Sequence, residues 1–312
     1  MQLSVVSKTI GLLLMVFSLT HIPPILIDFI YAEGEYLSFV ISFVLTLIGG
    51  FSLWRPYRNV KKDFHLRDGV LIVVCFWLVL SLFGTLPFLL TESINGLTFS
   101  GAFFESMSGL TTTGATVLSQ LDELPKSILF YRQQLQWLGG MGIIVLAVAV
   151  LPLLGVGGME LYHAESSGIS KDRLTPKLRH TAIALWKIYV SLTALCAIGY
   201  FLSGMTLFDA IGHSFSTVAI GGFSTHDGSI GYFNSLSIEV IAMFFMFLAG
   251  INFSLHFVAW NNRSLMNYLK DSEFKTYALI LVITAIIVLI FLSINAEYDS
   301  SSEAIRHSLF QT

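Results

Sequence analysis

Long apolar runs separated by short polar segments dominate this sequence. An apolar helix of about 20 residues crosses roughly 30 Å of hydrocarbon, and the clearest apolar runs are Val70–Leu90, Gly142–Leu154, Ile183–Leu202, Ile238–Trp260 and Tyr277–Ile294. Residues 1–30 are also apolar, but they lack the small-residue cleavage site of a secretory signal, and Pro23-Pro24 is expected to end the run. The pattern therefore predicts a polytopic membrane protein whose first helix is retained.

Two long excursions interrupt the spanning pattern, at residues 91–126 and 203–234. Each contains an apolar stretch, Leu97–Leu110 or Thr206–Ile220, that is too short to span a bilayer and is typical of a re-entrant segment. Non-helical backbone persists at membrane depth only where protein or a water-filled cavity covers it. Each excursion is therefore predicted to be a half-helix followed by an extended segment that returns outward, which is the geometry of a pore loop.

The composition agrees with a bilayer and excludes an ordinary soluble domain. Of the 312 residues, 54% are hydrophobic and only 12% are charged, whereas a soluble domain carries about 25% charged residues. Cys75 and Cys196 each lie within an apolar run, which predicts buried thiols and not a disulfide. No Cys/His cluster in the sequence has metal-ligand spacing.

The lysines and arginines alternate between loops, and this alternation predicts the orientation. All but three of the 17 lie near the N-terminus or in the regions 55–67, 171–187 and 263–275, while the loops between them are acidic. Because loops rich in Lys and Arg remain in the cytoplasm, the N-terminus is predicted to be cytoplasmic. The exceptions fall on the outer side and are expected to have local partners such as carboxylates; they are Lys126, Arg132 and Arg306.

An internal repeat relates the two excursions. At a shift of 108 residues, Thr98–Thr116 aligns with Thr206–Ser224 with five identities in nineteen positions. Glu105 and His213 occupy equivalent positions, and each is expected to hydrogen-bond its loop in place.

A third copy of the repeat begins near the end of the sequence. Glu303–Leu309 aligns with Asp209–Phe215 at a shift of 94 residues. By this alignment the sequence is expected to stop inside a third pore helix, as part of a longer chain. It would then supply two complete filter segments, whereas a closed ring of carbonyls needs about four.

The aligned glycines Gly114 and Gly222 suit a filter made of backbone carbonyls. Such carbonyls replace the water around a dehydrated cation, and turning them in one direction requires backbone angles that glycine adopts readily. The half-helices would direct the negative ends of their dipoles at the cation. Neither segment carries a charged side chain, which argues against a carboxylate ring. The predicted potassium ligands are the carbonyls of Thr112, Thr113, Gly114, Ile220, Gly221 and Gly222.

Other residues within apolar segments have simpler or open roles. The following glycines are predicted to serve helix packing or as hinges: Gly139, Gly140, Gly142, Gly155, Gly157, Gly158 and Gly250. Asn252 and His256 lie four residues apart on one helix face, where they would either line the inner cavity of the pore or hydrogen-bond a neighbouring helix.

These segments resemble the Trk/Ktr/HKT superfamily of potassium transporters, and within it the bacterial TrkH family of transmembrane subunits. The resemblance rests on the motifs LTTTGATVL (110–118), QWLGGMGIIVLAVAVLP (136–152), STVAIGGFSTHD (216–227) and EAIRHSLFQ (303–311). It implies an all-α polytopic fold of helix–pore-loop–helix repeats in a pseudo-fourfold arrangement, with one filter glycine per repeat. The implied domains are an N-terminal helix pair (1–62), a first repeat (63–160), a second repeat (161–262) and the start of a third (263–312).

The resemblance also implies a function and partners. Members of the family carry potassium across the bacterial inner membrane in a channel-like manner, and potassium is the substrate, with no cofactor expected on this chain. Glycine in place of serine at position 114 favours potassium over sodium. Members form homodimers and pair with TrkA, a cytosolic nucleotide-binding regulatory subunit. The basic segments 171–179 and 263–275 would dock TrkA or would act only as topology determinants.

Two other classes of function compete with conduction. An intramembrane hydrolase would use Ser216 or Ser224 with His213 or His226, although neither serine lies in a G-x-S-x-G nucleophile motif. A secondary transporter, for an organic solute or for sodium-coupled cation symport, would use broken helices at the bilayer midplane. A site for an organic solute needs convergent polar groups, and the filter-like segments have almost none.

Overall fold

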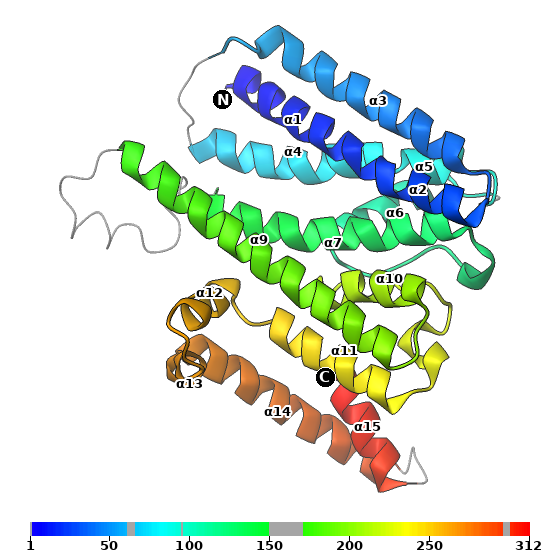
Figure 1. Ribbon diagram of the computed structural model, residues 1–312, viewed down its shortest axis with the longest axis vertical. Helices are drawn as coiled ribbons and strands as arrows, with labels where there is room; N and C mark the ends of the chain where they lie inside the picture. The colour runs from blue at the N-terminus through cyan, green and yellow to red at the C-terminus, as the bar shows by residue number, and fades with distance from the viewer. Residues whose placement is uncertain (1, 61–65, 95, 150–170, 296–299) are drawn as a thin grey trace.

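The computed structural model describes residues 2–60, 66–94, 96–149, 171–295 and 300–312, and these residues form helices and connecting loops without a strand (Figure 1). The α-helices are α1 (Leu3–Ser18), α2 (Ile22–Tyr31), α3 (Tyr36–Trp54), α4 (Leu66–Gly84), α5 (Leu86–Leu90), α6 (Phe99–Leu110), α7 (Lys126–Ala149), α9 (Lys171–Leu202), α10 (Leu207–Val218), α11 (Leu236–Ala249), α12 (Phe253–Asn261), α13 (Met266–Lys270), α14 (Ser272–Ile294) and α15 (Ser301–Gln311). Short 3-10 turns are η1 (Leu19–His21), η2 (Arg55–Tyr57), η3 (Leu121–Glu123) and η5 (Ser229–Phe233). The expected domain boundaries after residues 62 and 160 lie outside the described residues.

Several of these helices are long and apolar enough to cross a bilayer. Within the described ranges, five qualify on length and hydropathy, at Leu3–Tyr31, Tyr36–Tyr57, Asp68–Leu90, Ile183–Leu202 and Ser272–Ile294. The prediction of an all-α, multi-pass membrane protein is therefore confirmed. Figure 1 shows α1, α3 and α4 packed at one end of the molecule, with α14 and α15 at the other.

The first apolar run continues past the point where it was predicted to end. Pro23 and Pro24 lie in the first turn of α2, where the missing proline N–H costs no helical hydrogen bond. Helical structure therefore extends from Leu3 to Tyr31, with the 3-10 turn η1 between α1 and α2.

The predicted span Gly142–Leu154 begins inside a longer helix. Helix α7 begins at Lys126, and residues 150–154 lie outside the described part of the chain. Polar residues in its first half reduce the hydropathy that marks a membrane span. Three of these residues, Arg132, Gln133 and Gln136, are completely buried, so this half of α7 faces protein instead of lipid.

The predicted span Ile238–Trp260 is not one straight helix. It divides into α11 and α12, whose axes differ by 88°. Asn252 lies at the break and caps α12, because its side chain accepts a hydrogen bond of 3.0 Å from the backbone N–H of Ser254.

The turn between α2 and α3 ties the N-terminal hairpin to the helices that follow. The carboxylate of Glu33 accepts hydrogen bonds from the backbone N–H groups of Lys126 and Ser127, at 2.7 and 3.0 Å. A carboxylate at this position satisfies unpaired donors at the start of α7 and complements its dipole. Glu35 accepts a hydrogen bond of 2.6 Å from the hydroxyl of Thr91, which fixes the loop before α6.

Two consecutive units share one order of elements: a long helix, a short helix, an extended loop and a returning helix. The first unit contains α4 to α7, and the second contains α9 to α12. The short helices α6 and α10 begin at Thr98 and Thr206, and α15 begins at Ser300; each of these side chains accepts a hydrogen bond from the backbone N–H three residues later. The three caps occupy equivalent positions at the shifts of 108 and 94 residues found in the sequence.

Candidate ion-conducting site

Helices α6 and α10 end in the same backbone motif. Thr112 and Ile220 are left-handed, with φ of 54° and 51°. The N–H groups of the following residues, Thr113 and Gly221, donate to carbonyls five residues earlier, at 2.9 and 2.8 Å. This pairing is the Schellman motif, whose left-handed position is usually glycine. A β-branched residue is strained there, and such strain is concentrated at functional sites.

Two residues further along the chain, Gly114 and Gly222 are also left-handed, with φ of 76° and 87°. The whole conformation therefore repeats at a shift of 108 residues. A trans peptide points its N–H and C=O in opposite directions, and the N–H groups after Thr112 and Ile220 point back at the short helices. The carbonyls of Thr112 and Ile220 consequently point away from the ends of those helices.

The two segments lie against each other. A Cβ added to Gly114 would overlap the carbonyl oxygen of Gly221 and would lie 3.3 Å from the Cα of Gly222. Glycine at position 114 is therefore required both by its positive φ and by the close approach of the second segment. The structure thus brings together Gly114, Gly221 and Gly222, three of the six residues predicted from the sequence as filter residues.

Helix α7 supports the second segment through Gln136. Its side-chain Nε2 donates to the carbonyl of Gly221 at 2.7 Å, and its Oε1 accepts from the backbone N–H of Phe223 at 3.0 Å. The Gly221 carbonyl, which was expected to face the ion, therefore faces this amide. Sequence reasoning missed Gln136; the available signal was a pair of glutamines three residues apart, Gln133 and Gln136, within a membrane helix.

Gln133 lies one turn earlier and holds the same segment. In the orientation in which both the oxygen and the nitrogen of its amide have hydrogen-bond partners, the nitrogen of Gln133 donates to the carbonyls of Gly212 and Phe223 at 3.0 and 3.2 Å. Its oxygen then accepts from the backbone N–H of Thr225 at 3.2 Å. Two glutamines of α7 thus bind the backbone over residues 221–225.

A buried ion pair connects the loops that follow α6 and α10. The Nε of Arg132 donates to Glu105 at 2.7 Å, and both side chains are completely buried. The other guanidinium nitrogens donate to the carbonyl of Ser224 at 3.0 Å and to the hydroxyl of Thr116 at 3.1 Å. The guanidinium also lies 4.4 Å from the centre of the Phe223 ring. This carboxylate is the local partner expected for a cation on the outer side.

The other two cations that were expected on the outer side also have partners. Arg306 of α15 donates through two nitrogens to Glu239 of α11, both at 2.6 Å, as expected. Lys126 differs from the expectation of a carboxylate, because its Nζ lies 3.9 Å from the centre of the Tyr31 ring and 5.6 Å from that of Phe208.

Glu105 and His213 hold their loops, the role expected for both. Glu105 accepts from the hydroxyl of Thr116 at 3.0 Å and from the N–H of Val117 at 3.1 Å. His213 shares a hydrogen bond of 2.9 Å with the hydroxyl of Ser224. Because Thr116 and Ser224 are equivalent in the repeat, the two bonds are equivalent as well.

This equivalence explains the Ser–His contact that a hydrolase would also require. The first repeat makes the same contact with a carboxylate and a threonine, so loop support accounts for both copies. The other candidate serine, Ser216, hydrogen-bonds Gln133, and the other candidate histidine, His226, hydrogen-bonds Asp122.

His226 belongs to a cluster that joins the loop after α6 to the loop after α10. Its Nδ1 contacts Asp122, its Nε2 lies 3.3 Å from a carboxylate oxygen of Asp209, and its ring stacks on Tyr232. The hydrogen bond from His226 lowers the pKa of the Asp122 carboxyl below its ordinary value. Asp227 accepts from the backbone N–H of Leu121 at 2.9 Å, which adds a second link between the loops.

Asn252 and His256 make local hydrogen bonds. Besides capping α12, Asn252 donates to Glu273 at 3.1 Å. The ring nitrogens of His256 contact the hydroxyl of Tyr268 at 2.8 Å and the carbonyl of Leu248 at 2.9 Å. Of the two roles left open by the sequence, these contacts favour bonding to neighbouring helices.

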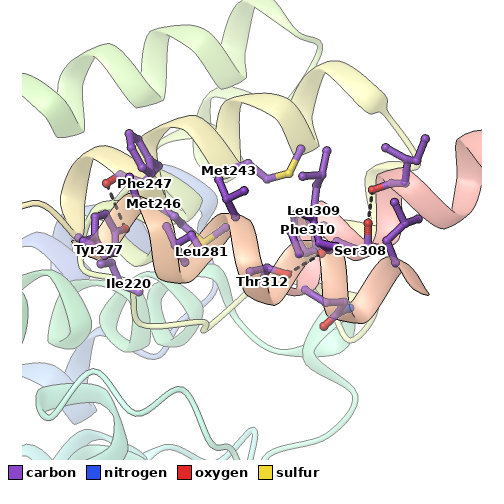
Figure 2. A pocket seen from close by; sticks show the side chains of 18 residues that line it. Ile220, Met243, Met246, Phe247, Tyr277, Leu281, Ser308, Leu309, Phe310 and Thr312 are labelled. Carbon is purple, nitrogen blue, oxygen red and sulfur yellow. Dashed lines mark hydrogen bonds between the residues drawn. The ribbon is translucent and has the colours of Figure 1, made fainter. Parts of the chain in front are cut away.

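An apolar cavity of about 810 Å³ lies beside the second segment, between α11, α14 and α15. Figure 2 shows Ile220 at its edge, with Met246, Phe247 and Tyr277 lining it. None of the lining residues is charged, and the hydroxyl of Tyr277 donates to the carbonyl of Phe247. The cavity therefore lacks the converging polar groups that would bind a charged organic solute.

Comparisons with known proteins give consistent similarities. Residues 36–297 match the TrkH family, described as cation transport protein. The chain is 52% identical over 312 residues to the Trk system potassium uptake protein TrkH of Halomonas elongata, and 50% identical to TrkH of Escherichia coli K12. The crystal structure of the potassium transporter TrkH from Vibrio parahaemolyticus aligns with the whole chain at a TM-score of 0.90 and 47% identity. The chain spans 64% of the length of each of these three relatives.

Proposed function

Because this chain belongs to the TrkH family of cation transport proteins, we propose that it forms part of a pathway for potassium uptake across a bacterial inner membrane. Potassium is the transported substrate, and the chain's own backbone supplies the ligands. The relatives named as potassium uptake proteins support this choice of ion.

One observation carries the proposal: two strained, glycine-containing segments of identical backbone conformation lie in contact at the ends of two short helices. Carbonyls in such segments replace the hydration shell of a cation, and the C-terminal ends of α6 and α10 favour positive charge. We assign the filter to residues 112–114 and 220–222. The carbonyls of Thr112, Ile220 and Gly222 are the strongest ligand candidates, because the Gly221 oxygen is shared with Gln136.

The rest of the proposal concerns assembly and orientation. We propose that the N-terminus is cytoplasmic, that two copies form a homodimer, and that a cytosolic nucleotide-binding subunit of the TrkA type gates channel-like conduction. On the side predicted to be cytoplasmic, the basic side chains Arg263, Lys270 and Lys275 are exposed. They are available to a docking subunit, whereas the side chains of 171–179 lie outside those described.

The test is rubidium uptake by the full-length protein in a strain that lacks its own potassium uptake. Gly114→Ser places a Cβ on the Gly221 carbonyl, and Gly222→Ser forces a side chain into a left-handed conformation. Both should reduce uptake by about tenfold or more, the factor that corresponds to roughly 1.4 kcal/mol.

Gly231→Ser is the matched control, because an added Cβ there meets no atom within 4 Å. It should transport like the wild type. If both filter variants kept wild-type uptake and wild-type preference for potassium over sodium, the filter assignment would be wrong.

A further inference from the structure

We infer that Gln136 is a positioning residue for ion selectivity: a single amide from the first repeat fixes the direction of the carbonyls in the second filter segment. The inference rests on the proposed function, and it adds the side chain that sets the geometry of the filter. Gln136 contacts the backbone of the filter segment and acts on the ion only through that backbone.

The amide binds on both sides of Gly222. Its nitrogen holds the carbonyl of Gly221 and its oxygen holds the N–H of Phe223. A trans peptide sets N–H and C=O in opposite directions, so drawing the Phe223 N–H toward α7 turns the Gly222 carbonyl away from α7. Glycine has no side chain to restrict the rotation of its flanking peptides, so these two hydrogen bonds supply the missing restraint.

Gln136 is itself held rigidly. Its side chain is completely buried, and its amide packs on the Cα of Gly221 so closely that a Cβ there would lie 2.8 Å from Nε2. One turn earlier, Arg132 anchors the same helix to Glu105 and to the carbonyl of Ser224. A rigid support of this kind fixes the direction of the carbonyls that replace the hydration shell of the ion.

The support is particular to the contact between the first and second repeats. Shifting Gln136 by 108 residues gives Phe244, which has no amide to offer the next repeat. The first segment is held by the bonds of Glu105 to Thr116 and Val117, whose counterpart in the second segment is the bond of His213 to Ser224. The inference therefore concerns the residues of the second segment and one side chain of α7.

The first experiment measures potassium and sodium flux into proteoliposomes that contain the full-length protein. Gln136→Met keeps the length of the side chain but removes the donor and the acceptor. We expect the potassium-to-sodium ratio to fall by about tenfold, equivalent to roughly 1.4 kcal/mol. Gln134→Met is the matched control, since Gln134 is buried on the same helix and its Oε1 has no hydrogen-bond partner; it should keep the wild-type ratio.

The second experiment uses Gln136→Glu and remains informative if Gln136→Met does not assemble. An ionised carboxylate cannot donate to the Gly221 carbonyl, whereas a protonated carboxyl offers one donor and one acceptor, as the amide does. The ratio should therefore be low at alkaline pH and should approach that of the wild type as the pH falls, with the wild type measured over the same range. A purely structural role would not produce this recovery.

The outcomes distinguish the inference about Gln136 from the proposed function of potassium uptake. Potassium-selective flux in the wild type together with an unchanged ratio in Gln136→Met would overturn the inference and leave the proposed function standing. A Gln136→Glu ratio that stays low at every pH would also overturn it. Failure of the wild type to transport potassium would instead refute the proposed function.

Discussion

The buried pair of Arg132 and Glu105 should couple the stability of the loops that follow α6 and α10. Arg132→Met removes the only cation that contacts Glu105 among the described residues, and it also removes hydrogen bonds to Thr116 and to the carbonyl of Ser224. Breaking a buried ion pair from one side costs about 3–5 kcal/mol, because the remaining charge is left without its partner. We expect Arg132→Met to lower the free energy of unfolding by an amount in that range.

The double variant Arg132→Met with Glu105→Met should lose less than the sum of the two single variants. The double variant removes both buried charges of this pair. The remaining loss of stability then comes only from the polar groups of Thr116, Val117 and Ser224 that lose a hydrogen-bond partner. Two residues in one hydrogen-bonded network usually show coupling of about 0.5–3 kcal/mol, and the direct contact of 2.7 Å between two fully buried groups places this pair near the upper end.

The assay is a double-mutant cycle on the free energy of unfolding, measured by denaturant titration in mixed micelles. Arg306→Met is the comparison, since its pair with Glu239 is partly exposed and should cost less than the loss of Arg132. The loss of stability in the double variant is compared with the sum of the losses in the two single variants. If the two agreed to within about 0.5 kcal/mol, the pair would not form a coupled network, and the argument for a shared support of both loops would fail.

Two further predictions concern other contacts. Gly139→Ala should destabilise the protein by about 1–3 kcal/mol, because a Cβ there would overlap the carbonyl of Leu110 at the end of α6. Gly142→Ala should be tolerated, because the atom nearest to an added Cβ lies 3.7 Å away. Thermal unfolding of the two variants compares these effects. The lowered pKa of Asp122 means that its ionised form stabilises the fold at pH above its ordinary value of 3.8, and that this contribution is lost as the pH falls through the lowered folded-state value. Asp122→Asn should therefore unfold at a lower temperature than the wild type at neutral pH, and the difference should disappear in strong acid; an equal difference at both pH values would refute this assignment.

The sequence alone determined the membrane class, most of the spans, and the equivalence of the segments that contain the short helices α6 and α10. Hydropathy fixes which stretches enter a bilayer, since a run of apolar residues has no other stable environment. The equivalence of Gly114 and Gly222 followed from the 108-residue shift, and it reappears in their dihedral angles. Helix α15 of the third copy likewise begins after Ser300, the position that the 94-residue shift makes equivalent to Thr206.

Only the tertiary structure decided how the segments after α6 and α10 are held. The span predicted from hydropathy started only at Gly142, whereas α7 starts at Lys126. The polar residues in the first half of α7 caused this difference, because hydropathy cannot distinguish a polar residue that faces protein from one that would face lipid. The positive φ of Thr112 and Ile220 was also invisible, since local propensity disfavours that conformation for β-branched residues. The partners of Gln136 lie more than 80 residues away along the chain. Hydrogen bonds across such separations depend on how the helices pack, which a local pattern of apolar and polar residues does not specify.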